Sequence, residues 1–67
     1  MIEVFINGER IAVNETQSLA AVLVALAFNC DRVAVAVNSE FVARGRYENH
    51  FLEAGDKIDV VAPVAGG

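Results

Sequence analysis

The first residues of the chain alternate between apolar and other side chains with a period of two. Residues 1–6 place isoleucine and valine on one side and leave Phe5 on the other, which predicts a half-buried strand. The next two residues, Asn7-Gly8, tolerate the positive φ angles of a tight hairpin turn. Residues 10–13 resume the alternation, so we expect a second strand that pairs with the first.

After Ser18 the apolar residues recur every three or four positions instead of every two. This spacing predicts one stripe of a helix that ends near Ala27 or Phe28, with the Ser18 hydroxyl as its N-cap. The stripe consists of Leu19, Val22, Leu23 and Leu26. The opposite side carries only alanine and valine, which favours either a helix of high propensity or, less simply, a second contact surface.

Three more strands are expected after the helix. Valine and alanine alternate over residues 33–37, which turns Ala34 and Ala36 to the outward side of a third strand. A bend at residues 38–39 leads into a short fourth strand around residues 41–42.

The last strand follows a loop with room for one helical turn over residues 45–50. It covers about residues 57–62 and turns Val61 outward. Pro63 ends the regular ladder because it has no N–H to donate. The residues after it show no amphipathic period, so we expect residues 63–67 to form a mobile C-terminal tail.

The order of these elements is that of the β-grasp, or ubiquitin-like, fold. We expect an α+β domain in which a mixed five-stranded sheet wraps around one helix, with the first and last strands parallel and adjacent. One apolar helix stripe needs one apolar sheet face to cover it, and the inward positions supply that face. A chain of 67 residues is too short for a second core, so residues 1–67 are expected to form a single domain.

The charge balance and the hydropathy pattern disfavour several classes of partner. Nine acidic and five basic residues give a formal net charge of −4, which argues against a phosphate-backbone ligand. The longest uncharged apolar run, Leu19–Phe28, has ten residues, whereas a membrane-spanning helix needs about 20. The chain has a single cysteine, Cys30, which excludes an internal disulfide and fits a reducing compartment. We therefore expect a cytoplasmic protein, monomeric when free, with neither nucleic acid nor membrane as a partner.

The side chains offer little for catalysis. Cys30 and His50 are the only residues of their kinds, and nothing marks an activated thiolate or a group that would orient a nucleophilic pair. Cys30 follows an apolar helix and is interpreted as a small buried hydrophobic residue. One cysteine and one histidine are too few for a metal site, and the carboxylates are scattered over turns and polar faces. We expect no catalytic residues, no metal and no bound cofactor.

The C-terminus is the exception. Two final glycines, Gly66 and Gly67, have a chance frequency of about 0.5% when glycine makes up roughly 7% of residues. Glycine has no Cβ, so such a tail can thread a narrow channel and accept close backbone contacts. An extended stretch from Pro63 to Gly67 spans about 15 Å at roughly 3.3 Å per residue. We expect the Gly67 carboxylate to be the working group, with Val64, Ala65 and Gly66 threading into a partner.

Three segments carry a family resemblance. They are residues 32–44 (RVAVAVNSEFVAR), residues 52–58 (LEAGDKI) and residues 64–67 (VAGG). Together they resemble the ThiS family, the sulfur carrier proteins of thiamine biosynthesis, and the resemblance covers nearly the whole chain. Two positions differ from the family pattern, since Ala43 stands where proline is common and Tyr47 where tryptophan is common.

The resemblance implies a mechanism in which the chain is a carrier and co-substrate. A ThiF-type adenylating enzyme would use ATP to convert the Gly67 carboxylate into an acyl-adenylate. A sulfur donor, such as a persulfide supplied by a cysteine desulfurase, would displace AMP and leave a thiocarboxylate. Thiazole synthase (ThiG) would then take this sulfur to build the thiamine thiazole.

The outward strand positions suggest where a partner docks. If the predicted register holds, an apolar patch forms on the open face of the sheet, close to the start of the tail. Its members are Phe5, Ala34, Ala36 and Val61.

Two other functions stay open on the sequence alone. One is a carrier of the molybdopterin synthase small-subunit type, whose sulfur goes to a pterin precursor. The other is a β-grasp interaction module whose tail is never activated.

Overall fold

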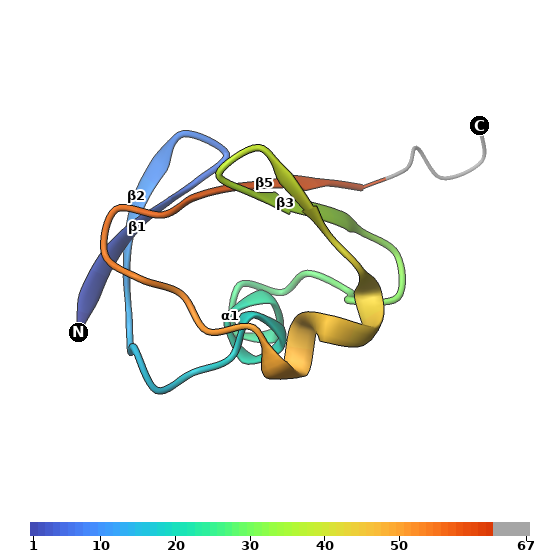
Figure 1. The fold of residues 1–67 in the computed structure, drawn as a ribbon, viewed down its shortest axis with the longest axis horizontal. Coiled ribbons are helices and arrows are strands. Elements are labelled where there is room, and N and C mark those ends of the chain that lie inside the picture. Colours follow the sequence, from blue (N-terminus) through green and yellow to red (C-terminus); the bar gives the residue numbers. More distant parts are fainter. Residues whose placement is uncertain (63–67) are drawn as a thin grey trace.

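A mixed sheet of five strands forms the centre of the computed structural model, which describes residues 1–62. The strands lie in the order β2-β1-β5-β3-β4. Helix α1 and the 3-10 helix η1 cover one face of the sheet and leave the other face open (Figure 1). In chain order the elements are β1 (Ile2–Ile6), β2 (Glu9–Val13), α1 (Leu19–Ala25), β3 (Ala34–Val37), β4 (Glu40–Val42), η1 (Arg44–Asn49) and β5 (Lys57–Val61). The predicted α+β, β-grasp architecture is confirmed.

Two hairpins with two-residue turns build the outer parts of the sheet. Strands β1 and β2 are antiparallel, and the turn between them has φ angles of 53° at Asn7 and 83° at Gly8. Strands β3 and β4 are joined in the same way, with φ angles of 52° at Asn38 and 68° at Ser39. Positive φ at both central residues is typical of the type I′ turn, whose twist matches that of the flanking strands.

Strand β5 fills the gap between the two hairpins. It runs parallel to β1, with Phe5 opposite Lys57 and Ile6 opposite Ile58, and antiparallel to β3. The expected parallel contact between the first and last strands is therefore present. Because β5 has a neighbour on both sides, the strand that leads to the C-terminus is the middle strand of the sheet.

Helix α1 begins where the sequence pattern predicts. Ser18 is the N-cap, and its hydroxyl oxygen accepts a hydrogen bond from the Ala21 N–H at 3.2 Å. The predicted stripe faces the sheet, since Leu19, Val22 and Leu23 are buried.

The helix ends earlier than predicted, at Ala25 rather than near Ala27 or Phe28. Ala27 has a φ of 66° and donates its N–H to the Val24 carbonyl at 3.0 Å, while the Phe28 N–H reaches the Leu23 carbonyl at 2.9 Å. These two bonds form a Schellman C-cap, a motif that usually places glycine at the left-handed position. An alanine at this position gives no sequence signal, which explains the wrong boundary.

The segment predicted as a loop with one helical turn is the 3-10 helix η1. It positions Tyr47, which is buried and donates its O–H to the Val33 carbonyl at 3.2 Å. The sequence pattern assigned Tyr47 to a loop and did not include it in the core. Its hydrogen bond ties η1 to the residue that precedes β3.

The core lies between the sheet and the two helices. Its fully buried members come from both layers, with the side chains of Val4, Val35 and Ile58 from the sheet packed against Leu19, Val22 and Leu23 of α1. Among residues 1–62, no helix is long and apolar enough to cross a membrane. The predicted mobile tail, residues 63–67, lies outside the described residues.

Candidate functional site

The candidate reactive group, the Gly67 carboxylate, and the threading residues Val64, Ala65 and Gly66 lie outside the described residues. What the structure describes is the surface from which they continue. This surface surrounds the end of β5, at the opposite end of the molecule from the N-terminus (Figure 1).

Three of the four predicted docking residues lie together on the open face of the sheet. Val61 is the last residue of β5 and pairs with Ala34, and Ala36 lies two positions further along β3. Ala36 also pairs with Phe41 on β4, so Phe41 belongs to the same face. We call Ala34, Ala36, Phe41 and Val61 the tail-side patch.

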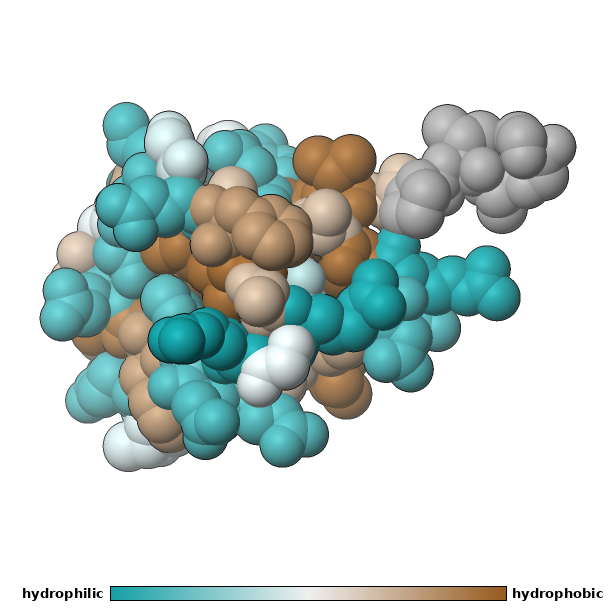
Figure 2. All heavy atoms as spheres, turned by 45° about the vertical axis from the view of Figure 1, so that its right-hand side comes forward, coloured by the Kyte–Doolittle hydropathy of each residue, from teal (hydrophilic) through white to brown (hydrophobic). Residues whose placement is uncertain are grey.

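The tail-side patch exposes two large apolar side chains. Phe41 is 73% exposed and Val61 is 63% exposed, whereas the alanines between them leave the sheet surface shallow. Figure 2 shows apolar side chains gathered over the β3–β4 side of the molecule, beside the point where the described residues end. Exposed clusters of this kind are typical of protein contact surfaces.

The fourth predicted docking residue, Phe5, lies apart from the other three. It faces the open side but is half-buried, and it pairs with Lys57 at the start of β5. Val61 lies four positions after Lys57, a distance of about 13 Å along a strand. Asp59 lies between them on the same face. The parallel pairing of β1 with the start of β5 therefore corrects the expectation that Phe5 lies near the start of the tail.

Phe41 is the residue that the sequence pattern failed to assign to the patch. The signal was present, because a two-residue turn at Asn38-Ser39 places Val37 opposite Glu40 and therefore Ala36 opposite Phe41. Asn-Ser is a weaker turn signal than Asn-Gly, so the register of the short strand could not be derived from the alternation alone.

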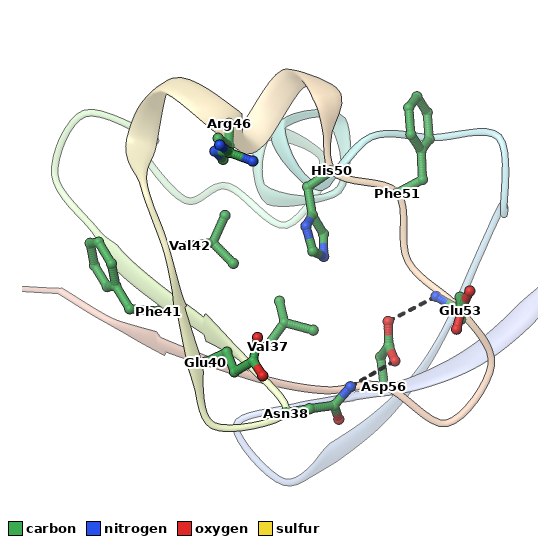
Figure 3. A pocket seen from close by; sticks show the side chains of 10 residues that line it. All are labelled: Val37, Asn38, Glu40, Phe41, Val42, Arg46, His50, Phe51, Glu53 and Asp56. Atoms are coloured by element: carbon green, nitrogen blue, oxygen red, sulfur yellow. Dashed lines mark hydrogen bonds between the residues drawn. The ribbon is translucent and has the colours of Figure 1, made fainter.

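A hollow of about 470 Å³ lies at the other side of β4, between this strand, η1 and the loop before β5. Val37, Val42 and His50 point into it (Figure 3). On its lower rim Asp56 accepts hydrogen bonds from the Asn38 amide at 3.0 Å and from the Glu53 N–H at 2.8 Å. The hollow is lined by Val37, Asn38, Glu40, Phe41, Val42, Arg46, His50, Phe51, Glu53 and Asp56.

Cys30 and His50 do not meet in the structure. Cys30 lines a second hollow of about 380 Å³, beside α1 and η1, and its sulfur lies 3.9 Å from the Ala20 carbonyl oxygen. It is half-buried rather than fully buried, and it packs against the core. Within residues 1–62, no group of three or more histidine, cysteine or acidic residues is arranged to hold a metal ion.

One carboxyl group with a shifted pKa lies near the N-terminus, away from the end of β5 (Figure 1). The pKa of the Glu15 carboxyl is lowered, first by a hydrogen bond from its own backbone N–H, then by the hydrogen bond and charge of the N-terminal ammonium. That ammonium, on Met1, lies 3.2 Å from Glu15 Oε2. On the open face Arg10 Nε lies 3.6 Å from Glu3 Oε2. Both pairs are exposed, so they contribute little to stability.

The fold and the surface around the end of β5 define the class of this protein: it is a β-grasp domain whose central strand leads into a C-terminal Gly-Gly tail. A family model described as the ThiS family matches residues 3–67. The chain belongs to the ThiS family. This membership supports a role as a sulfur carrier in thiamine biosynthesis.

Two curated relatives are similar to the chain over almost its full length. The chain is 32% identical over 66 residues to the uncharacterized protein ycf40 of Porphyra purpurea, covering 98% of this chain and 93% of the relative. It is 35% identical over 66 residues to ycf40 of Pyropia yezoensis, with the same coverage.

Solved structures agree with the fold. A crystal structure of the thiamine biosynthesis protein ThiS from Geobacter metallireducens has a TM-score of 0.82 at 23% identity, covering 98% of this chain and 100% of that one. A solution NMR structure of a thiamine biosynthesis protein from the same organism has a TM-score of 0.77 at 22% identity, covering 98% and 88%.

Proposed function

We propose that the chain carries sulfur on its C-terminal residue as a Gly67 thiocarboxylate. A carboxylate oxygen of Gly67 attacks the α-phosphorus of ATP on a ThiF-type adenylating enzyme and releases pyrophosphate. A persulfide, supplied through a cysteine desulfurase, attacks the acyl carbon and expels AMP, which leaves an acyl disulfide. A second thiol then cleaves the S–S bond, so the thiocarboxylate is released and the donor side is left as a disulfide.

The single observation that carries this proposal is the extent of the family match. It includes Gly66 and Gly67 and covers all of the described residues from Glu3 onward. The topology supports the same proposal, because β5 is the central strand of the sheet: its first residues pair with β1 and β3, and its last residues pair with β3. A rigid base of this kind suits a tail that must be delivered into another protein.

The chain acts in this proposal as a co-substrate rather than as a catalyst. Within residues 1–62, the single cysteine, Cys30, and the single histidine, His50, line different hollows and so form no nucleophile–base pair. All bond making is therefore assigned to the partners: the adenylating enzyme with its ATP, the sulfur donor, and thiazole synthase (ThiG) as the acceptor of the sulfur.

Docking of the adenylating enzyme is assigned to the tail-side patch. The patch includes Val61, the last residue of β5, so an enzyme seated on it would have its active-site channel close to the start of the tail. Phe41 is the largest side chain of the patch and is 73% exposed, and large aromatic side chains often dominate binding energy at interfaces.

Intact mass spectrometry tests the proposal directly. Incubated with an active ThiF-type enzyme, ATP and a sulfur source, the chain should gain the mass difference between sulfur and oxygen, and fragmentation should map the change to Gly67. One residue added after Gly67 should abolish the gain, because the reacting carbonyl would then be part of a peptide bond. Gly66→Val should slow it sharply, since a β-branched side chain crowds a backbone that must pass closely.

The acceptor enzyme distinguishes the remaining alternatives. Transfer of the sulfur to thiazole synthase supports the thiamine pathway, whereas transfer only to the large subunit of molybdopterin synthase would assign the chain to the pterin pathway. No sulfur incorporation with partners of verified activity would reject the carrier function and favour a β-grasp interaction module.

A further inference from the structure

Two asparagines occupy equivalent positions in the two hairpins and face β5 from opposite sides. Asn7 begins the β1–β2 turn with φ 53°, and Asn38 begins the β3–β4 turn with φ 52°. Asparagine tolerates this left-handed conformation better than most residues. Each asparagine also uses its side-chain amide to bind the backbone of β5, which the turn itself does not require.

Asn7 holds the end of β5 that leads to the tail. The Val60 N–H donates to Asn7 Oδ1 at 2.8 Å, and Asn7 Nδ2 donates to the Val60 carbonyl at 3.2 Å. The Asn7 backbone N–H donates to the Ile58 carbonyl at 2.9 Å. The backbone ladder between β1 and β5 contains two residue pairs, Phe5 with Lys57 and Ile6 with Ile58. The side chain of Asn7 therefore extends this parallel ladder past the point where β1 itself turns away.

Asn38 makes the corresponding contacts at the start of β5. Its Oδ1 accepts from the Lys57 N–H at 3.0 Å, and its backbone N–H donates to the Lys57 carbonyl at 2.7 Å. Its Nδ2 donates to Asp56 at 3.0 Å (Figure 3). The two side-chain amides thus form hydrogen bonds with opposite ends of the same strand. Only Asn7 binds the end of β5 that leads to the C-terminus.

We infer that Asn7 is a positioning residue for activation of the tail, an inference that rests on the function proposed above. On the β1 side of β5, the Asn7 amide is the partner that the structure gives to both polar backbone groups of Val60. Without it, Val60 and Val61 are held by β3 alone, through their pairing with Val35 and Ala34. Unpaired backbone at a strand end opens more readily.

The expected consequence is kinetic. An adenylating enzyme that docks on the tail-side patch needs the end of β5 in its closed position, so that the tail starts in the right place and direction. If only part of the molecules are closed, the apparent affinity falls in proportion to that fraction, while the rate at saturation is unchanged. Loss of the Asn7 amide should therefore raise KM and spare kcat.

We call the two hydrogen bonds between the Asn7 amide and the Val60 backbone the Asn7 clasp. Asn7→Gly separates the clasp from the turn, because glycine accepts the positive φ and removes only the amide. Asn38→Gly is the matched control, since it removes the same group from the same kind of turn at the other end of β5. Asn7→Asp keeps the acceptor for the Val60 N–H and replaces the donor by a second oxygen that faces the Val60 carbonyl. All variants are compared below their melting temperatures, with folding checked by circular dichroism.

Two measurements are made on each variant. Amide hydrogen exchange of the free protein reports on the clasp itself, and we expect Val60 to exchange about tenfold faster in Asn7→Gly but not in Asn38→Gly. Pyrophosphate release with a ThiF-type enzyme and ATP reports on activation. We expect KM to rise about twofold in Asn7→Gly, less in Asn7→Asp and not measurably in Asn38→Gly, with kcat unchanged in all three.

The outcomes separate the positioning role from the proposed function. Faster Val60 exchange with an unchanged KM in Asn7→Gly overturns the positioning role and leaves the carrier function standing. An equal rise of KM in Asn7→Gly and Asn38→Gly also overturns it, because the effect would then follow general stability. No pyrophosphate release with the unaltered chain and an enzyme of verified activity overturns the proposed function and the positioning role with it.

Discussion

The two faces of the sheet differ in what their side chains can contribute. On the covered face Val35 is 1% exposed and packs against α1, whereas on the open face Val61 is 63% exposed and has no helix above it. The residues of the two faces alternate along the same strands, so they share backbone geometry and differ in surroundings. The covered face therefore supplies the folding free energy, and the open face is available for a partner.

The largest expected effect is a difference in stability between two identical substitutions. Val35→Ala should lower the free energy of unfolding by about 2–3 kcal/mol, since it removes buried methyl groups and leaves a cavity. Val61→Ala should change it by no more than about 0.5 kcal/mol, as is usual for exposed positions. Because both sites lie in strands, the loss of β-propensity is common to the two variants. Urea denaturation followed by circular dichroism gives both values, and equal losses would mean that the open face is covered in the free protein.

A second test measures binding instead of stability and compares two residues of the open face. Phe41→Arg should weaken binding to the adenylating enzyme by about tenfold or more, because it removes a large exposed aromatic side chain from the tail-side patch. Phe5→Arg should have a smaller effect, since Phe5 is half-buried and lies at the other end of β5. Isothermal titration calorimetry with native-like variants measures both affinities. A stronger effect at Phe5 would move the docking surface toward the start of β5.

A third, smaller effect concerns the hydrogen bond that joins η1 to the residue before β3, on the covered side of the sheet. Tyr47→Phe removes the O–H that donates to the Val33 carbonyl and leaves that acceptor unpaired in a buried place. We expect a loss of about 1 kcal/mol in the free energy of unfolding. The urea midpoint should fall with an unchanged slope, and a midpoint equal to that of the unaltered protein would show that the carbonyl finds another partner.

The smallest effect is expected at the rim of the sheet, which belongs to neither face. The pKa of Glu15 is lowered in the folded protein, so its contribution to stability is present above the unfolded pKa and is lost as the pH falls through the folded pKa. Glu15→Gln should therefore differ slightly from the unaltered protein at neutral pH and match it in acid. Melting temperatures recorded from neutral to acidic pH test this, and a difference that grows in acid would contradict the assignment.

Sequence periodicity was sufficient for the elements and their faces. The inward residues of β1, β2, β3 and β5 follow from alternation, and the helix stripe follows from the spacing after Ser18, because burial of one face imposes these patterns directly. Positions that depend on local backbone chemistry were harder. Ala27 adopts a left-handed C-cap without the usual glycine, and Ser39 has positive φ without the usual sequence signal.

Contacts between distant parts of the chain could not be derived from periodicity at all. The placement of Phe5 away from Val61 depends on the offset with which β1 pairs with β5, and nothing local encodes that offset. The Asn7 clasp joins residues 53 positions apart. Gly67, the residue on which the function depends, was identified from composition and family resemblance, and it lies outside the described residues.

The opposite placement of the N-terminus and the end of β5 has a practical consequence for protein engineering. Met1 is 83% exposed, and its closest charged contact is the exposed pair with Glu15. A fluorescent domain, an affinity handle or a surface anchor joined ahead of Met1 would extend away from the end of β5 (Figure 1). Such a fusion would turn the carrier into an immobilised bait or a sensor, with its C-terminal side left clear for the enzymes to approach.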